Sequence, residues 1–315
     1  MADTTILFAS DVHGSEVCWR KFLNSARHFG AQVLLMGGDI TGKAVIPVVA
    51  CSHGRYRAHW EGEQVVAESD LPALERRLAN AGCYTYRCDE AELARLDADP
   101  AAQRRLFDRL IRERVEAWMR LAEERLGDSG VTCLVMPGND DEVFVAEAIA
   151  TSSYVINPEG RVVDVGGLPM ISVGVSNKTP WNSPREVSEE EMAALIAHLV
   201  HQVRDVRRCL FNVHVPPFGT AIDQAPVLDA TLKPVVAGGS VQMGPVGSTA
   251  VRAAIERHQP LIGLHGHVHE ARGAVKIGKT VCVNPGSQYG DGILDAFLVR
   301  VNAQKGLRGY QYVSG

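Results

Sequence analysis

The sequence lacks the features that mark secreted and membrane-spanning proteins. Its seven cysteines are odd in number and form no CxxC pair, so we interpret them as reduced side chains, several of which lie in apolar, strand-like runs. No apolar run approaches the length of a transmembrane helix. The first residues show no basic segment followed by an apolar one, which is the pattern of a secretory leader. We therefore expect a cytoplasmic protein with no membrane partner.

Positive charge is also scarce. The chain has 32 Lys and Arg residues against 37 Asp and Glu residues, a net charge of −5. This balance argues against tight binding of a polyanion, so nucleic acid is disfavoured as a partner and no basic groove of a nuclease is visible. With 315 residues, 46% of them hydrophobic, the chain can bury a large core, as one α/β unit or as one domain with a sizeable insertion.

The sequence does contain a series of apolar runs that end in Asp, His or Asn. Uninterrupted apolar runs of this length predict strands that are buried on both faces. Strands alternating with helices predict a sheet whose chemistry lies at the carboxyl ends of the strands. Five such runs, at 5–10, 33–36, 131–136, 209–213 and 261–264, lead to Asp11 and His13, to Asp39, to Asn139, to His214, and to His267 and His269.

Residues 44–130 interrupt this pattern. They contain a hairpin signal near 56–66, a helix that follows Asp70 and ends before Gly82, and a long helix from Asp99-Pro100 to about Gly127. We therefore expect a mainly helical insertion, as a cap or interface element through which a homo-oligomer would form. The catalytic domain would then comprise 1–43 and 131–315. Shorter, closely spaced strands near the C-terminus favour two packed sheets with helices outside.

The polar residues at the strand ends suit metal ions. Seven oxygen and nitrogen ligands are too many for one zinc or iron ion but suit two ions, and Asp39, alone in its loop, is the candidate to bridge them. Two ions about 3.5–4 Å apart share a hydroxide and clamp the oxygens of a phosphoryl group. No cysteine lies in these loops, which disfavours a thiolate site. Mixed Asp, His and Asn ligation suits Mn, Fe or Zn, and also Co or Ni, without choosing among them.

These motifs resemble, in their order and strand contexts, the five motifs of the calcineurin-like metallophosphoesterase superfamily. The resemblance spans residues 6–287 apart from the insertion, and Asn284-Pro285-Gly286-Ser287 is similar to a segment that often follows the last motif in bacterial members. It implies an α/β fold, a four-layer αββα sandwich of two mixed β-sheets flanked by helices. By position, it implies that one metal is held by Asp11, His13 and His269, the other by Asn139, His214 and His267, and that Asp39 bridges.

The resemblance also implies the reaction, a metal-dependent hydrolysis of phosphoric esters. A hydroxide that bridges the two divalent or trivalent ions would attack phosphorus in line with the leaving group. The substrate would be a small-molecule phosphoester whose phosphate lies near Asn139 and His214. A phosphomonoesterase or protein phosphatase, and a non-catalytic scaffold that retains the pocket, are the alternatives.

One position departs from the family pattern. Many members carry His after Gly-Asn, and that side chain is thought to stabilise the transition state or protonate the leaving oxygen; here the residue is Asp140. A carboxyl beside two cations should be ionised, and its charge would oppose a dianionic monoester more than a monoanionic diester. We therefore predict a phosphodiesterase. His53 and His265 are candidates for the missing acid, against ordinary loop and structural roles, and Asn177 is a candidate for the substrate pocket together with Trp181.

Overall fold

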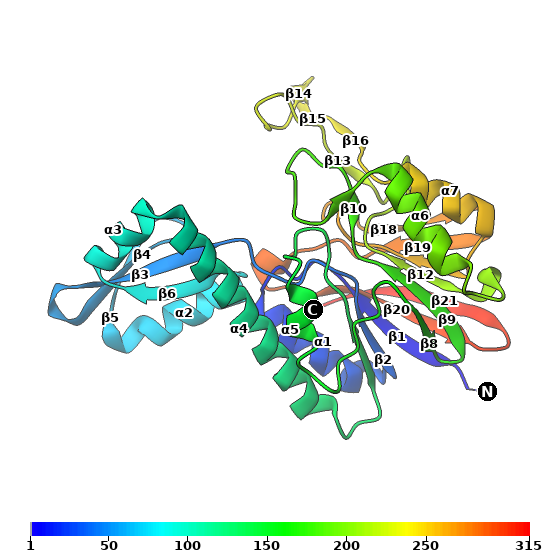
Figure 1. Cartoon of the computed structure of the whole chain (residues 1–315), viewed down its shortest axis with the longest axis horizontal. Helices are drawn as coiled ribbons and strands as arrows, with labels where there is room; N and C mark the ends of the chain where they lie inside the picture. The colour runs from blue at the N-terminus through cyan, green and yellow to red at the C-terminus, as the bar shows by residue number, and fades with distance from the viewer. Residues whose placement is uncertain (1) are drawn as a thin grey trace.

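Two large sheets face each other in the computed structural model, which describes residues 2–315 (Figure 1). The first sheet has the strand order β21-β20-β1-β2-β7. Strands β1, β2 and β7 run parallel, and β20 is antiparallel to both β1 and β21. The strands are β1 (Thr4–Ala9), β2 (Val33–Met36), β7 (Thr132–Val135), β20 (Asp295–Asn302) and β21 (Gly306–Ser314).

The second sheet has the strand order β18-β19-β17-β12-β9-β8. Its four central strands run parallel, and the outer strands β18 and β8 are antiparallel to their neighbours. The strands are β8 (Val162–Val165), β9 (Leu168–Val173), β12 (Leu210–Val213), β17 (Ile262–Leu264), β18 (Gly273–Ile277) and β19 (Thr280–Asn284).

The side chains of β1 show why its sequence is apolar throughout. Ile6 and Phe8 belong to the core between the two sheets, whereas Leu7 and Ala9 belong to the core beneath the helices. Successive side chains of a strand point to opposite faces, so a strand covered on both sides needs an apolar residue at every position. The four-layer αββα sandwich that the sequence predicts is confirmed.

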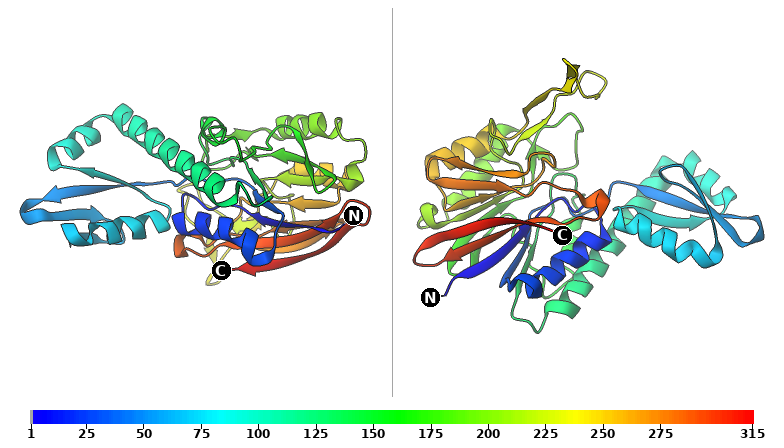
Figure 2. Two further views of the ribbon diagram at one scale, coloured as in Figure 1. Left: turned by 90° about the horizontal axis from the view of Figure 1, so that it is seen from below. Right: turned by 180° about the vertical axis from the view of Figure 1, so that it is seen from behind.

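Helices form the two outer layers (Figure 2). The first sheet is covered by three helices whose apolar side chains share its outer core, and the second sheet is covered by two. Trp19 and Trp118, stacked 4.8 Å apart between ring centroids, join two of the helices on the first sheet. These helices are α1 (Glu16–Phe29), α4 (Pro100–Leu126) and α5 (Val145–Ile149) on the first sheet, and α6 (Glu189–Val200) and α7 (Thr249–His258) on the second.

The segment after Asp39 leaves the two sheets and forms a small unit of its own, which projects from the main body in Figure 1. The only β structure that the sequence predicted there was a hairpin, but the structure has a four-stranded sheet with the order β5-β4-β3-β6. The part of α4 from Ile111 onward packs in the main core, so the insertion interpreted as 44–130 shares that helix with the body. The unit consists of β3 (Val45–Cys51), β4 (Arg55–His59), β5 (Glu63–Ala67), α2 (Leu71–Asn80), β6 (Tyr84–Cys88) and α3 (Glu90–Ala98).

Residues 217–247, called the arm here, extend from the second sheet, and their tip is seen at the top of Figure 1. Two short antiparallel pairs build the arm, β13 with β16 and β14 with β15. A further pair, β10 (Ser176–Asn177) and β11 (Glu186–Val187), lies after β9. Among the described helices, none has the length and apolarity needed to cross a membrane. The arm strands are β13 (Gln224–Pro226), β14 (Val236–Ala237), β15 (Ser240–Val241) and β16 (Met243–Pro245).

Candidate metal centre

The residues that follow five strands of the two sheets converge on one edge of the sandwich. They form two groups of three, in which one ligand atom from each residue lies within 4.8 Å of the others, and a third such group consists of His13, Asp39 and Asp140. Several of the backbones have positive φ angles, which non-glycine residues rarely adopt and which are common at functional sites. The first group is Asp11, His13 and His269, and the second is Asp39, His214 and His267, with positive φ at Asp11, His13, Asp39 and His267.

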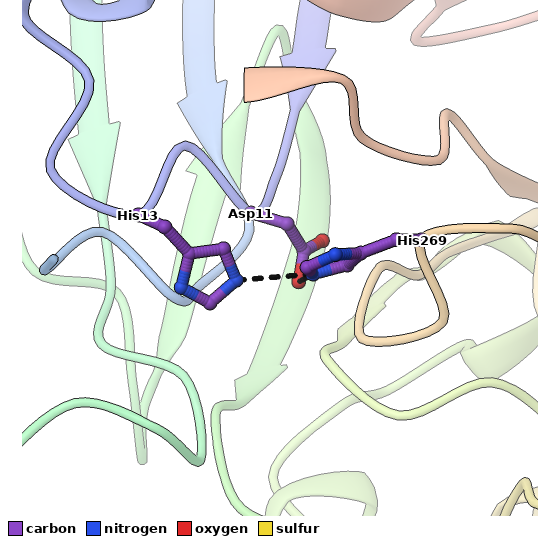
Figure 3. A group of neighbouring side chains, drawn as sticks. All are labelled: Asp11, His13 and His269. Atoms are coloured by element: carbon purple, nitrogen blue, oxygen red, sulfur yellow. Dashed lines mark hydrogen bonds and ion pairs between the residues drawn. The ribbon is translucent and has the colours of Figure 1, made fainter. Parts of the chain in front are cut away.

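In the first group the two imidazoles point their Nε2 atoms at each other, 3.0 Å apart, as the dashed line in Figure 3 shows. His269 Nε2 also lies 3.5 Å from Asp11 Oδ1. Burial lowers the pKa of His13 to about 3. Burial alone would raise the pKa of Asp11, but His269 and His214 together lower it to about 2. A neutral imidazole and an ionised carboxylate are the forms that bind metals. His13 and Asp11 are in these forms, whereas burial would lower the pKa of His269 but Asp11 raises it.

In the second group His214 Nε2 lies 3.3 Å from Asp39 Oδ2. His214 Nδ1 lies 2.9 Å from the carbonyl oxygen of Gly37, which orients the ring so that Nε2 faces the centre. His267 Nδ1 lies 2.7 Å from Asn139 Oδ1, which adds the amide oxygen to the same cluster. All seven residues predicted from the sequence therefore come together, with nitrogen and oxygen atoms of the kind that Mn, Fe and Zn accept.

The glycines of the motifs make room for ligands that come from other motifs. A Cβ on Gly138 would lie 2.8 Å from Cγ of Asp39 and closer still to its Oδ1. A Cβ on Gly266 would collide with Ser10 and with the carboxylate of Asp11. The Gly-Asn and Gly-His pairs are thus needed because the backbone touches a neighbouring ligand.

Asp141 is a site residue that sequence reasoning missed. It is fully buried and accepts hydrogen bonds from the backbone N–H groups of Ile40, Thr41 and Gly138, at 3.1, 2.8 and 2.7 Å, and from the Thr41 hydroxyl at 2.6 Å. It ties the Asp39 loop to the Asn139 loop. Ser183 Oγ, 2.8 Å from Asn139 Nδ2, accepts the hydrogen bond that orients this amide. No local pattern points to either residue.

The sequence argument treated Asp140 as an uncompensated negative charge, and the structure contradicts that assumption. Lys43 forms an ion pair with it, and its backbone N–H donates to Asp39 Oδ1 at 2.9 Å. Burial and the charge of Asp39 raise the pKa of Asp140, and Lys43 acts in the opposite direction. The lysine lies just before the insertion, far from Asp140 in sequence. The argument for diesters from a lone negative charge is weakened accordingly.

The two histidines considered for the missing acid do not reach the cluster. His53 is exposed, in the turn after β3, and the strand β3 of seven residues carries the chain roughly 20 Å away from Asp39 at about 3.3 Å per residue. His265 is buried, and its Nδ1 lies 2.8 and 3.1 Å from the carbonyl oxygens of Val213 and Val215. These contacts hold the His265 ring among the strand ends. His265 therefore has a structural role, which was the alternative to a role as the missing acid.

A cavity of about 960 Å³ opens onto the metal-centre residues. Asn177 and Trp181 lie in its wall. The Asn177 amide nitrogen lies 3.3 Å from the carbonyl oxygen of Val246 and donates to it, which joins the end of β10 to the arm. From the metal centre the cavity wall includes Asp39, Asn139, Asp140, His267 and His269, with Lys43 beside them.

Comparisons with known proteins agree with this fold. No family model matches the sequence. Over 154 residues, 48% of this chain, it is 32% identical to the uncharacterized protein MJ1162 of Methanocaldococcus jannaschii, and the match spans 62% of that protein's length. The structure is similar to that of TT1561 of Thermus thermophilus, with a TM-score of 0.53, 12% identity and 99% of each chain covered. This likeness concerns the fold.

Phosphoesterases are among the more distant solved structures that the chain resembles. YfcE, a phosphoesterase from E. coli, matches with a TM-score of 0.32 and 12% identity over 98% of both chains. A score this low carries no argument about the reaction. The chemistry has to be inferred from the side chains at the strand ends.

Proposed function

We propose that this chain is a metal-dependent hydrolase of phosphoric esters of the calcineurin-like metallophosphoesterase type. The observation that carries the proposal is the convergence of two carboxylates, four imidazoles and one amide at the ends of five strands. The His13 and His269 Nε2 atoms, 3.0 Å apart, support a shared cation because both aim a ring nitrogen at one point. A set of buried acids and bases without such an ion would be costly to fold.

The residues fit two ions, which is the arrangement we propose. Asp11, His13 and His269 would hold one ion, and Asn139, His214 and His267 the other, with Asp39 as a ligand of both. When bound, the two ions would activate water and neutralise charge on the phosphoryl oxygens. Mn, Fe and Zn suit these donors equally, so the identity of the ions is left to measurement.

The chain's own side chains would position the ester. Asn139, held by Ser183 and His267, lines the cavity and would contact a phosphoryl oxygen, whereas His214 is fully buried and does not line it. Lys43, half exposed at the mouth of the centre, is the cation nearest the position of the missing histidine. We propose that it stabilises negative charge on the leaving oxygen, because its ammonium keeps its proton: burial would lower its pKa, but Asp140 raises it.

Two observations bear on the choice between diester and monoester. Asp140 disfavours a second negative charge on the substrate, and Lys43 favours it. The carboxylate is the more buried of the two side chains, with 23% of its surface exposed against 52% for the lysine, and solvent screens the lysine more effectively. We therefore propose a phosphodiesterase, with a phosphomonoesterase as the second candidate that Lys43 favours.

The test is a paired assay on manganese-reconstituted protein. Hydrolysis of bis(p-nitrophenyl) phosphate is compared with that of p-nitrophenyl phosphate, and bound metal is counted by mass spectrometry. We expect the diester to be hydrolysed faster, and Asp39→Asn to lose both the activity and at least one of two bound ions. A faster monoester would replace phosphodiesterase by phosphomonoesterase. Metal-loaded protein without activity on either ester would refute the hydrolase and favour a scaffold.

A further inference from the structure

The cavity at the metal centre has a second half that the proposed chemistry does not use. Its wall is aliphatic and aromatic, and most of it comes from the arm and from the loop after β10. Several of these side chains are unusually exposed for their type: 39% for Phe218, 42% for Val227, 44% for Leu232 and 61% for Trp181. The apolar half is lined by Trp181, Phe218, Pro226, Val227, Leu228, Leu232, Pro234 and Val246.

Leu232 is held in this wall at a conformational cost. Its φ angle is +62°, a left-handed conformation that bulky side chains avoid and that asparagine and aspartate tolerate. Asp229 fixes the turn, because its carboxylate accepts hydrogen bonds from the backbone N–H groups of Thr231 and Lys233 at 2.7 and 3.1 Å. Strain that the surrounding structure maintains points to a role for the side chain, and this leucine lines the cavity.

Three polar side chains in this part of the wall already make hydrogen bonds, although Asn177 Oδ1 is buried without a partner. The Asn177 amide nitrogen donates to Val246, and the Lys178 ammonium to the carbonyl oxygen of Glu186 at 3.3 Å. The carboxylate of Glu189 accepts hydrogen bonds from Ser248 and from the start of α7. A sugar or nucleobase would find few free partners there, whereas a hydrocarbon would need none.

We propose that the substrate is a phosphodiester carrying an unbranched hydrocarbon chain, with its phosphate at the metal centre and its chain in the apolar half of the cavity. The inference rests on the proposed function. Both halves belong to one cavity, so a single molecule spans them. In the reaction a water oxygen bonds to phosphorus, one ester P–O bond breaks, and the departing alcohol takes up a proton.

The experiment measures binding of n-alkylphosphonates, which are not hydrolysed. Calorimetry on manganese-loaded protein gives the Kd of methyl-, butyl- and octylphosphonate below their micellar concentrations. Burial of a methylene contributes about 0.8 kcal/mol, roughly fourfold in affinity, and partial burial in an open cavity contributes about twofold. We expect octylphosphonate to bind about 100-fold more tightly than methylphosphonate.

Leu232→Asn is the informative variant because asparagine suits the left-handed backbone, so the fold should be retained. It should weaken octylphosphonate binding about tenfold and leave methylphosphonate unchanged. Val241→Asn is the matched control, since Val241 is also 44% exposed and lies on the arm in the strand pair with Val236, but not in the cavity wall. It should change neither Kd.

The inference is wrong if affinity does not depend on chain length, or if Leu232→Asn and Val241→Asn behave alike. Tighter binding of phenylphosphonate than of octylphosphonate would also contradict the inference, and would indicate an aromatic group in place of the hydrocarbon chain. If a second copy of the chain covers the apolar half, the affinity for alkylphosphonates will not depend on chain length and will decrease as the protein concentration rises. Chain-length dependence without hydrolysis of any p-nitrophenyl ester would refute the proposed function while retaining the apolar binding site.

Discussion

Gly138→Ala tests whether the close approach of the Asn139 loop to Asp39 is needed for metal binding. The backbone of Gly138 does not need a left-handed conformation, because its φ is not positive, so the added methyl group acts only through space. Its Cβ would lie 2.8 Å from Asp39 Cγ. Carbon atoms pack at about 3.5 Å, so one of the two must move by at least about 0.7 Å, and the added Cβ lies nearer still to Oδ1 and to the backbone nitrogen of Asp39.

The displacement predicts a loss of metal affinity together with a loss of stability of similar size. Overpacking of this size costs about 1–3 kcal/mol in the free energy of unfolding. A metal site tolerates ligand shifts of only about 0.2 Å, and changes next to ligands reduce metal affinity by about 10- to 100-fold. Since Asp39 is the proposed ligand of both ions, we expect the upper end of that range.

The assay is calorimetric titration of manganese into metal-free protein, combined with thermal unfolding of the same samples. Gly290→Ala is the control, because a Cβ there meets no atom within 4 Å and the φ angle is not positive. We expect the control to bind manganese as the unmodified protein does. Equal manganese affinity for Gly138→Ala and the control would refute the reasoning that Gly138 positions Asp39 for metal.

Charge at the centre leads to two further predictions. Lys43→Met should lower activity on the monoester more than on the diester, by about 2- to 5-fold in the ratio of kcat/KM values, because an ion pair near the surface contributes up to about 1 kcal/mol; an unchanged ratio would exclude the proposed role of Lys43. Removal of metal with a chelator should lower the free energy of unfolding by about 2.7 kcal/mol relative to protein in manganese at 100 times its Kd, as measured by differential scanning calorimetry. Asp39→Asn should show a much smaller difference, and an equal one would place the stabilising metal elsewhere.

The metal-centre residues were predictable because strands and their ends are local properties of the sequence. A strand covered on both faces, such as β1 with Ile6 and Leu7 on opposite sides, has to be apolar at each position. Parallel strands place their carboxyl ends at one edge of a sheet, so Asp11, Asp39 and Asn139 were expected together. The motif order then indicated the pairing with His214 and His267.

Contacts between loops that are distant in sequence could be read only from the folded chain. No periodic pattern in the sequence predicts that Lys43 and Asp140 lie together. Their ion pair forms because the insertion begins beside the Asn139 loop. The sequence does not show that Asp141 connects two loops. The four groups that donate hydrogen bonds to it belong to Gly138, Ile40 and Thr41.

The layers of the fold and the gathering of the seven polar residues at the strand ends were encoded locally, since both depend on alternation within strands and on the residue that ends each strand. The placement of His53 away from the centre, the charge that faces Asp140 and the apolar half of the cavity depended on where an insertion and an arm return to the body. Those positions are set by packing between segments far apart in the chain, which local patterns do not encode.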